Sequence, residues 1–213
     1  MTVEANGGRA QVLAGIRLSL GRTVPAPQPI VPLPGRGPRP AFEGDLVERF
    51  VAKMREKSAT VLRLGSQAEV GPAVADFVAS VKAAPRLCVA RALAGVDWPA
   101  GLEVACRAAL RDDENSVTPC LAAVAESGAV VTLSGPDTPS TLNFVPDNHI
   151  VVVHERQVVR HFEDAWALWR ASGQPIPRTL NIISGPSRTA DIEQTIQLGA
   201  HGPRRLHILL IAA

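Results

Sequence analysis

Apolar residues in this chain follow two different spacings, and each spacing predicts a different element. Where they recur every three or four positions, they form one face of an amphipathic helix. Where four to six follow one another, they predict a buried strand. Helices are predicted for residues 8–20, 46–57, 70–81, 119–126, 162–169 and near 190–198, and strands for residues 59–64, 86–90, 102–108, 129–133, 149–153, 179–184 and 206–211.

The strands in the second half of the chain are apolar at nearly every position. The runs VVTL at 130–133, IVVV at 150–153 and LHILLI at 206–211 show no strict alternation of polar and apolar residues. Such strands are typical of a mostly parallel sheet that helices cover on both faces. The alternation of strands and helices therefore predicts an α/β fold with a mostly parallel, doubly wound sheet.

The first forty residues differ from the rest. Residues 23–40 contain seven prolines, which cannot join a strand ladder and disfavour helix in the residue before them. An extended linker therefore separates the helix at 8–20 from the remainder of the chain. We expect an N-terminal helix with a Pro-rich arm at 1–40 and a single α/β domain at 41–213.

Composition excludes several classes of protein. The net charge is +2, with 22 basic and 20 acidic side chains, no tyrosine and five phenylalanines. With no basic run, no tyrosine and little phenylalanine to stack on bases, no nucleic-acid partner is indicated. The N-terminus lacks the apolar core of a signal peptide, and no stretch of about 20 apolar residues could span a membrane. We expect a cytoplasmic protein.

The three cysteines show no metal-binding spacing. Cys88, Cys106 and Cys120 are 18 and 14 residues apart, whereas iron–sulfur clusters and structural zinc draw on closely spaced thiolates. No histidine pair has the spacing of a zinc site on one helix. We expect no metal and no cofactor in this chain.

The segment 182–211 suggests a binding loop. Gly185-Pro186 breaks the preceding strand, Thr189 is a plausible N-cap, and Asp191 with Glu193 would lie in the first turn of a helix. A loop past the carboxyl end of a parallel strand can hold a carboxylate or phosphate on backbone N–H groups, with Arg188 nearby. Alternatively, the two acids satisfy the helix dipole and pair with Arg188. Residue patterns alone leave both interpretations open.

Two segments resemble a known family. The run Ser184-Gly185-Pro186-Ser187-Arg188-Thr189-Ala190-Asp191-Ile192-Glu193, followed by Gly199-Ala200-His201-Gly202-Pro203-Arg204, resembles the C-terminal signature of the lactate-utilization protein C family. The run 142–150, LNFVPDNHI, resembles that family's other segment, a strand ending in Pro with a following His. The opening pattern of a helix, a Pro-rich linker and a second helix also resembles that family.

This resemblance implies a fold similar to the sugar-phosphate isomerase and CoA-transferase superfamily. It also implies a role in oxidising L-lactate to pyruvate beside iron–sulfur partner proteins, which would hold the clusters. The ligand-binding residues expected on this basis are Ser184, Gly185, Pro186, Ser187, Arg188, Thr189 and Asp191, with His201 and Gly202 on the following turn.

Glu126 is the candidate for catalysis. Glu126-Ser127-Gly128 resembles the turn that carries the nucleophilic glutamate of CoA transferases, and a carboxylate at a strand edge can act as a nucleophile. Alternatively, Glu126 is a solvated residue at a helix end. Among the histidines, His207 is predicted to pack within its strand, and His154 and His161 to lie at the surface.

Two functions remain open. The first is an accessory subunit of an iron–sulfur lactate-oxidising system that is not catalytic alone. Its N-terminal arm would dock on its partners; alternatively, the N-terminal helix folds back on its own body. The second is an enzyme acting on a phosphorylated or CoA-linked acid, with Glu126 and the 184–193 loop in its site. A concave site shared by Glu126 and Arg188 would favour the second.

Overall fold

The computed structural model describes residues 7–21, 37, 39–190, 196–199 and 201–212. It divides into two units, Met1–Pro38 and Arg39–Ala213. In the first unit, α1 (Gly7–Ser19) is an amphipathic helix, as the apolar spacing predicts. The second unit contains all the other elements and is called the body here.

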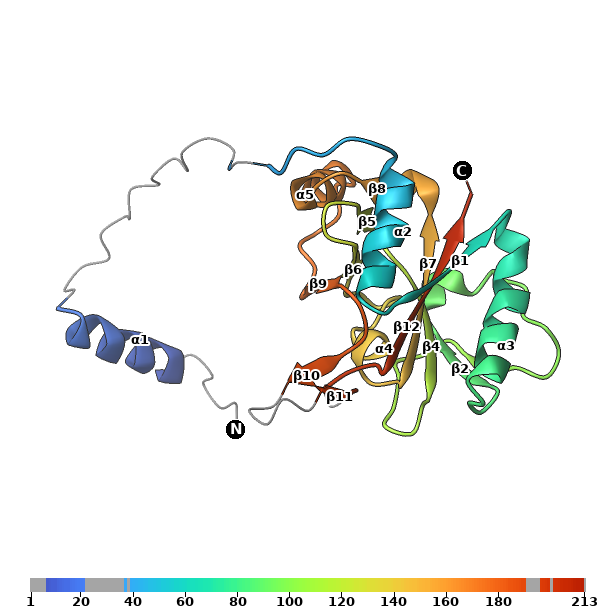
Figure 1. The fold of residues 1–213 in the computed structure, drawn as a ribbon. Coiled ribbons are helices and arrows are strands. Elements are labelled where there is room, and N and C mark those ends of the chain that lie inside the picture. Colours follow the sequence, from blue (N-terminus) through green and yellow to red (C-terminus); the bar gives the residue numbers. More distant parts are fainter. Residues whose placement is uncertain (1–6, 22–36, 38, 191–195, 200, 213) are drawn as a thin grey trace. The chain divides into compact units, whose positions relative to one another are not determined.

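A six-stranded parallel sheet, the main sheet, forms the centre of the body (Figure 1). Every neighbouring pair of its strands is parallel. In spatial order the strands are β1 (Thr60–Leu64), β12 (Arg205–Ile211), β7 (Asn148–His154), β4 (Asn115–Pro119), β2 (Arg86–Val89) and β3 (Glu103–Ala105).

A smaller second sheet packs on one face of the main sheet. Antiparallel pairs join β5 to β6 and β6 to β9, while β5 and β8 are parallel. Its strands are β8 (Val158–Val159), β5 (Ala122–Val124), β6 (Ala129–Leu133) and β9 (Leu180–Ile183). A separate antiparallel pair, β10 (Arg188–Ala190) and β11 (Ile196–Leu198), follows β9.

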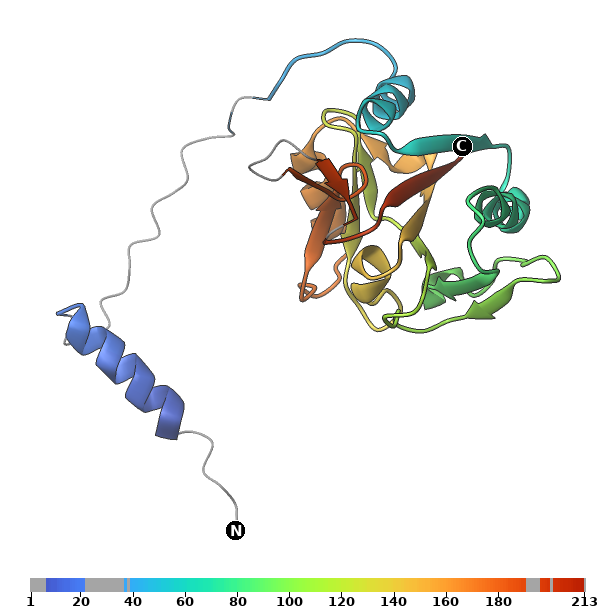
Figure 2. The same ribbon diagram turned by 60° about the horizontal axis from the view of Figure 1, so that its bottom comes forward.

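Helices cover the main sheet on both faces (Figures 1 and 2). The helix α3 (Val70–Ser80) packs on one face, and α2 (Leu46–Glu56) with the second sheet packs on the other. The remaining helices are α4 (Thr141–Phe144), α5 (Phe162–Ala171) and the 3₁₀ turns η1 (Gln67–Glu69), η2 (Arg91–Leu93) and η3 (Glu155–Gln157).

The core explains why the central strands are apolar throughout. Alternate residues of β12 enter opposite clusters: Leu209 packs toward α3, whereas Ile208 and Leu210 pack toward α2 and the second sheet. All three are fully buried. A strand covered on both faces has no polar side, so the predicted α/β fold with a mostly parallel, doubly covered sheet is confirmed.

The predicted helix at 119–126 is wrong. This stretch holds the end of β4, the strand β5 and the turn into β6. Alanines favour helix intrinsically, but propensity is a weak prior that tertiary pairing overrides. Here Ala122–Val124 pairs with both β6 and β8. The turn places Gly128 at φ +63°, where an added Cβ would lie 2.5 Å from the Cβ of Lys53.

The helix predicted near 190–198 is also wrong in its described part. Arg188–Ala190 and Ile196–Leu198 pair as antiparallel strands, so Thr189 is a strand residue and not an N-cap, while Asp191 and Glu193 lie outside the described residues. Short apolar runs do not distinguish helix from strand by spacing alone. The run 142–150 likewise begins with the short helix α4, and its strand starts at Asn148.

Candidate functional site

A cavity opens between the two sheets at the amino ends of β7 and β12. We call it the inter-sheet cavity, and its volume is about 210 Å³. Main-sheet residues His149 and Leu206 line one side, and Ile182 and Ile183 of β9 line the other. The rest of the lining comes from α4 and two loops: Asn143, Phe144, Ser184, Gly185, Ser187, His201, Gly202 and Pro203.

The most buried polar group of this cavity is His149. Its side chain is fully buried, and its Nε2 lies 2.8 Å from the hydroxyl of Thr118 on the neighbouring strand. Within the described part of the chain, its Nδ1 has no hydrogen-bond partner. Burial lowers the pKa of His149 to about 3, so the imidazole is neutral at neutral pH.

Further buried polar residues hold α4 over the cavity. Asn143 is 3% exposed, and its amide donates to the hydroxyl of Thr132 on β6 at 3.0 Å. The hydroxyl of Ser116 donates to the carbonyl of Leu142 at 2.6 Å. Buried polar groups of this kind need partners, so these bonds set the position of the short helix α4, which contributes Asn143 and Phe144 to the cavity.

The loop after β9 forms one rim of the cavity, and Lys57 holds it. The Lys57 ammonium group donates to the Ser184 hydroxyl and to the Ser127 carbonyl. Gly185 has φ +95°, and an added Cβ would lie 2.8 Å from the carbonyl oxygen of Lys57. Only glycine fits so close an approach at this φ. Arg188 donates to the Ser58 hydroxyl, and so points toward the end of α2.

The structure brings together five of the nine expected ligand-binding residues. Residues 184, 185, 187, 201 and 202 all line the inter-sheet cavity. Pro186 and Arg188 are not among its lining residues, whereas the side chain of Thr189 and the whole of Asp191 lie outside the described part of the chain. The expected setting of this loop is wrong, because β9 is antiparallel to β6 in the second sheet and is not a strand of the parallel sheet.

Glu126 lies elsewhere. Its carboxylate is 3.1 Å from Nδ1 of His161, with the two side chains 23% and 8% exposed. His161 is therefore buried, contrary to the expected surface position, because Phe42 and Glu126 pack around it from distant parts of the chain. Neither Glu126 nor Arg188 lines the inter-sheet cavity. The concave site that the enzyme hypothesis needs is not formed there.

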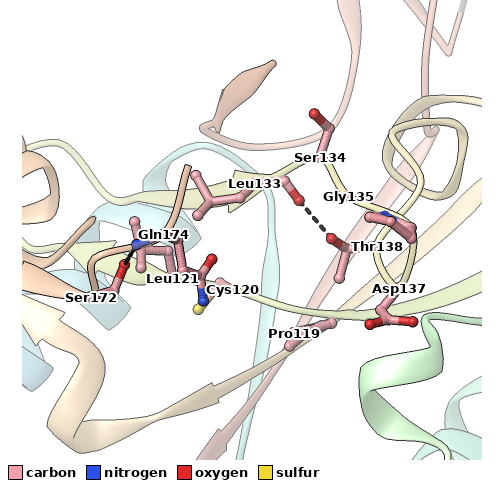
Figure 3. Close-up of a pocket in the computed structure, with 11 residues that line it drawn as sticks. Pro119, Cys120, Leu121, Leu133, Ser134, Gly135, Asp137, Thr138, Ser172 and Gln174 are labelled. Carbon is pink, nitrogen blue, oxygen red and sulfur yellow. Dashed lines mark hydrogen bonds between the residues drawn. The ribbon is translucent and has the colours of Figure 1, made fainter. Parts of the chain in front are cut away.

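A second cavity lies at the opposite edge of the main sheet, just past the carboxyl end of β4 (Figure 3). We call it the edge cavity, and its volume is about 340 Å³. It lies beside a topological switch point of the main sheet. The connection from β2 to β3 and the connection from β4 to β7 run in opposite directions across the sheet. Ligands of open α/β sheets often bind at such points. Its lining is Pro119, Cys120, Leu121, Leu133, Ser134, Gly135, Pro136, Asp137, Thr138, Ser172 and Gln174.

Most polar groups of the edge cavity have partners, either in its lining or just outside it. The hydroxyl of Thr138 donates to the carbonyl of Leu133 at 2.8 Å (Figure 3), and Asp137, 63% exposed, lies 3.9 Å from Arg91. Burial raises the pKa of Cys120 to about 12, so its thiol stays protonated. The inter-sheet cavity is the stronger candidate site, because its buried histidine has no partner at Nδ1 among the described residues.

Sequence reasoning did not assign a role to His149, Asn143 or Lys57. One signal was available for Lys57, because the chain has lysine only at 53, 57 and 82. Asn143, between Leu142 and Phe144, and His149, after Asn148, give no local sign of a cavity.

Among the described residues, no group of three or more His, Cys, Asp or Glu side chains could hold a metal ion. In the same part of the chain, no helix has the length and apolar character needed to cross a membrane.

Comparisons with known proteins match the segment of the chain that contains this cavity. Residues 98–211, which include every residue lining the inter-sheet cavity, match the LUD domain. An uncharacterized protein of Neisseria meningitidis is 38% identical over 88 residues, 41% of this chain and 38% of that protein. Lactate utilization protein C of Bacillus subtilis is 34% identical over 92 residues, 42% of this chain and 38% of that protein. These matches thus span less than half of either relative.

Two matches from Deinococcus radiodurans, one in sequence and one in structure, cover more of the chain. Its Lactate utilization protein C is 26% identical over 222 residues, 99% of this chain and 97% of that protein. The crystal structure of a DUF162 family protein from that organism superposes with a TM-score of 0.59 and 24% identity, covering 78% of this chain and 96% of that one. The structural match supports the fold.

Proposed function

This chain belongs to the LUD domain family, and we propose that it acts in the cytoplasm in L-lactate oxidation, as an accessory subunit that carries no redox centre. The family resemblance drawn from the sequence is confirmed. The observation that carries the proposal is the alignment, over 99% of this chain, with a relative named Lactate utilization protein C. The inter-sheet cavity lies inside the segment that defines the family, which supports a role for it in the shared function.

The partners in this proposal are iron–sulfur proteins, and α1 is the docking element. Within its own unit its apolar side chains are exposed: Val12 is 63%, Ile16 is 49% and Leu18 is 82% exposed. An isolated helix of 13 residues is marginally stable in water, so an apolar groove on a partner would stabilise it. The Pro-rich linker limits the entropy lost on docking.

The environment of the cysteines supports a chain without a cluster. Burial raises the pKa of both Cys88 and Cys120 to about 12, whereas a cluster binds thiolates. We predict that anaerobic reconstitution with iron and sulfide leaves the purified protein with far less than about four irons per chain. Tight retention of a full [4Fe–4S] complement after desalting would contradict the prediction.

Deleting the gene in the source organism tests the proposed function. The strain should lose growth on L-lactate and keep growth on pyruvate, because only the oxidation step is missing. A tagged copy should restore growth and should co-purify, from lactate-grown cells, with proteins that contain iron–sulfur clusters. Unchanged growth on lactate would reject the proposal.

The enzyme alternative has one observation in its favour, the pairing of Glu126 with the buried His161. A carboxylate held in this way is positioned for covalent chemistry. In the complemented strain, Glu126→Gln should abolish growth on lactate if the carboxylate is a nucleophile, and should leave growth unchanged if the pair is structural. Co-purification of the partners shows in either case whether the variant still folds and docks.

A further inference from the structure

The Nδ1 nitrogen of His149 is a buried polar atom with no hydrogen-bond partner among the described residues. Both ring nitrogens of His149 are inside the protein, and Nε2 is hydrogen-bonded to Thr118. Within the described residues Nδ1 has no partner, although His149 lines the inter-sheet cavity. A buried polar atom without a partner is unfavourable. A molecule in the cavity could supply the missing hydrogen bond.

The imidazole selects the kind of group it can bind. Because burial lowers the pKa of His149 to about 3, the ring is uncharged and offers either one N–H or one lone pair at Nδ1. A hydroxyl group can bond to either form, and a carbonyl oxygen can bond to the N–H form. A carboxylate would gain no charge pairing at this depth. The deep end of the ligand is therefore a neutral oxygen.

The walls and the rim set the rest of the ligand. Leu206, Ile183 and Phe144 supply apolar surface beside His149. At the rim, the Ser184 hydroxyl accepts a hydrogen bond from the Lys57 ammonium group, which brings a positive charge close to the cavity. A short apolar segment fits the walls, and an anionic group fits the rim.

The size of the cavity limits the ligand further. A volume of about 210 Å³ corresponds to about seven waters at about 30 Å³ each. It holds a molecule of roughly that many non-hydrogen atoms, such as a three-carbon acid, and cannot enclose a nucleotide or coenzyme A.

We propose that the inter-sheet cavity binds a short 2-hydroxy or 2-oxo carboxylic acid. Its 2-oxygen bonds to Nδ1 of His149, and its carboxylate lies at the Ser184 rim near Lys57. This inference rests on the proposed function for its physiological setting, and the geometry of the cavity supplies the ligand class. Nδ1 of His149 thereby distinguishes these acids from plain carboxylic acids, because a plain acid leaves that nitrogen without a partner.

Titration of the purified full-length protein tests the assignment, with its histidine rings labelled with ¹⁵N. L-Lactate or pyruvate should shift the Nδ1 resonance of His149 and leave His207 unchanged. His207 is an internal control, because it is a buried histidine of the same sheet that does not line the cavity. Propionate, which lacks the 2-oxygen, should bind at least about ten-fold more weakly. Lactamide, which lacks the carboxylate, should also bind more weakly.

Two variants extend the test without altering the core. Lys57→Met should weaken L-lactate binding several-fold, since it removes the charge at the rim. Lys82→Met, on the loop after α3, should have no effect. The proposal fails if millimolar L-lactate and pyruvate leave Nδ1 of His149 unshifted, since the cavity then holds water alone. It also fails if propionate binds as tightly as lactate.

The outcomes separate this inference from the proposed function. If the gene is needed for growth on lactate but neither acid binds, only the cavity assignment is wrong. If the acids bind but growth on lactate does not need the gene, the cavity assignment stands and the role in lactate oxidation is rejected.

Discussion

His149 and His207 lie on the neighbouring strands β7 and β12 of the main sheet, and their side chains point to opposite faces of it. His207 pairs with Ile150 in the strand register, lies 2.6 Å through its Nδ1 from the Thr60 hydroxyl and stacks on Phe77 at a centroid distance of 4.2 Å. The prediction of a packed strand residue is confirmed. Burial lowers the pKa of His207 to about 4 and that of His149 to about 3.

These two histidines predict a loss of stability in mild acid. The unfolded chain takes up protons near the ordinary pKa of 6.5, whereas the folded chain does so only near pH 4 and pH 3. Stability is therefore complete above pH 6.5 and falls as the pH drops toward the folded pKa values, by up to about 1.4 kcal/mol per pH unit for each histidine. Urea unfolding between pH 7.5 and 4.5 measures this slope.

His207→Gln provides the control for this prediction, because glutamine can still bond to Thr60 but does not titrate. Its unfolding free energy should be lower at pH 7.5, since the stacking on Phe77 is lost. Its dependence on pH between 6.5 and 4.5 should be shallower by the contribution of one histidine. A slope identical to that of the wild type would show that other groups cause the acid sensitivity.

Among the described secondary-structure elements, α1 has the most exposed apolar side chains. Within the unit Met1–Pro38, several of its apolar residues are exposed. The body begins at Arg39, whose guanidinium pairs with Glu163 and Asp164 at the start of α5. A deletion that tests the arm should therefore end at Pro38 and keep Arg39.

We predict that the chain without residues 1–38 folds normally and binds its partners at least ten-fold more weakly, because α1 carries the docking face. Pull-down with partners from lactate-grown cells and thermal unfolding of the body measure the two effects. In the full-length chain, Ile16→Asp should reproduce the loss, whereas Gln11→Ala should not. If the truncated chain binds as tightly as the intact one, α1 is not the docking element.

At the scale of the whole molecule, β12 contributes side chains to both large hydrophobic cores of the body, one on each face of the main sheet. Leu209 lies in the core under α3, and Leu210 lies in the core shared with α2 and the second sheet; both are fully buried. Since one strand contributes to both cores, the layers on the two faces of the main sheet should unfold together.

We predict that Leu209→Ala and Leu210→Ala each lower the free energy of unfolding by about 2–5 kcal/mol and leave a single transition. Urea unfolding followed by circular dichroism and by tryptophan fluorescence measures both properties, because Trp98 lies against the first core and Trp166 lies on α5. Leu110→Ala, at a residue that is 63% exposed, should change stability by less than about 0.5 kcal/mol. Two separate transitions would show that the two layers fold independently.

The sequence by itself determined the fold class, because strands such as 206–211 are apolar on both faces and can exist only between two covering layers. It also determined α2, α3 and α5, whose apolar stripes are long enough to identify. Five of the cavity residues could be named in advance, because turn residues and a family resemblance single them out without any contact information.

Tertiary structure decided the rest, because the contacts involved join residues far apart in the chain. Strand pairing with β6 and β8, and not alanine propensity, made 122–124 a strand. Packing of Phe42 against His161 buried a residue expected at the surface. The cavity itself exists only where the second sheet meets β7 and β12, and no local pattern reveals that Nδ1 of His149 is left there without a partner from the described chain.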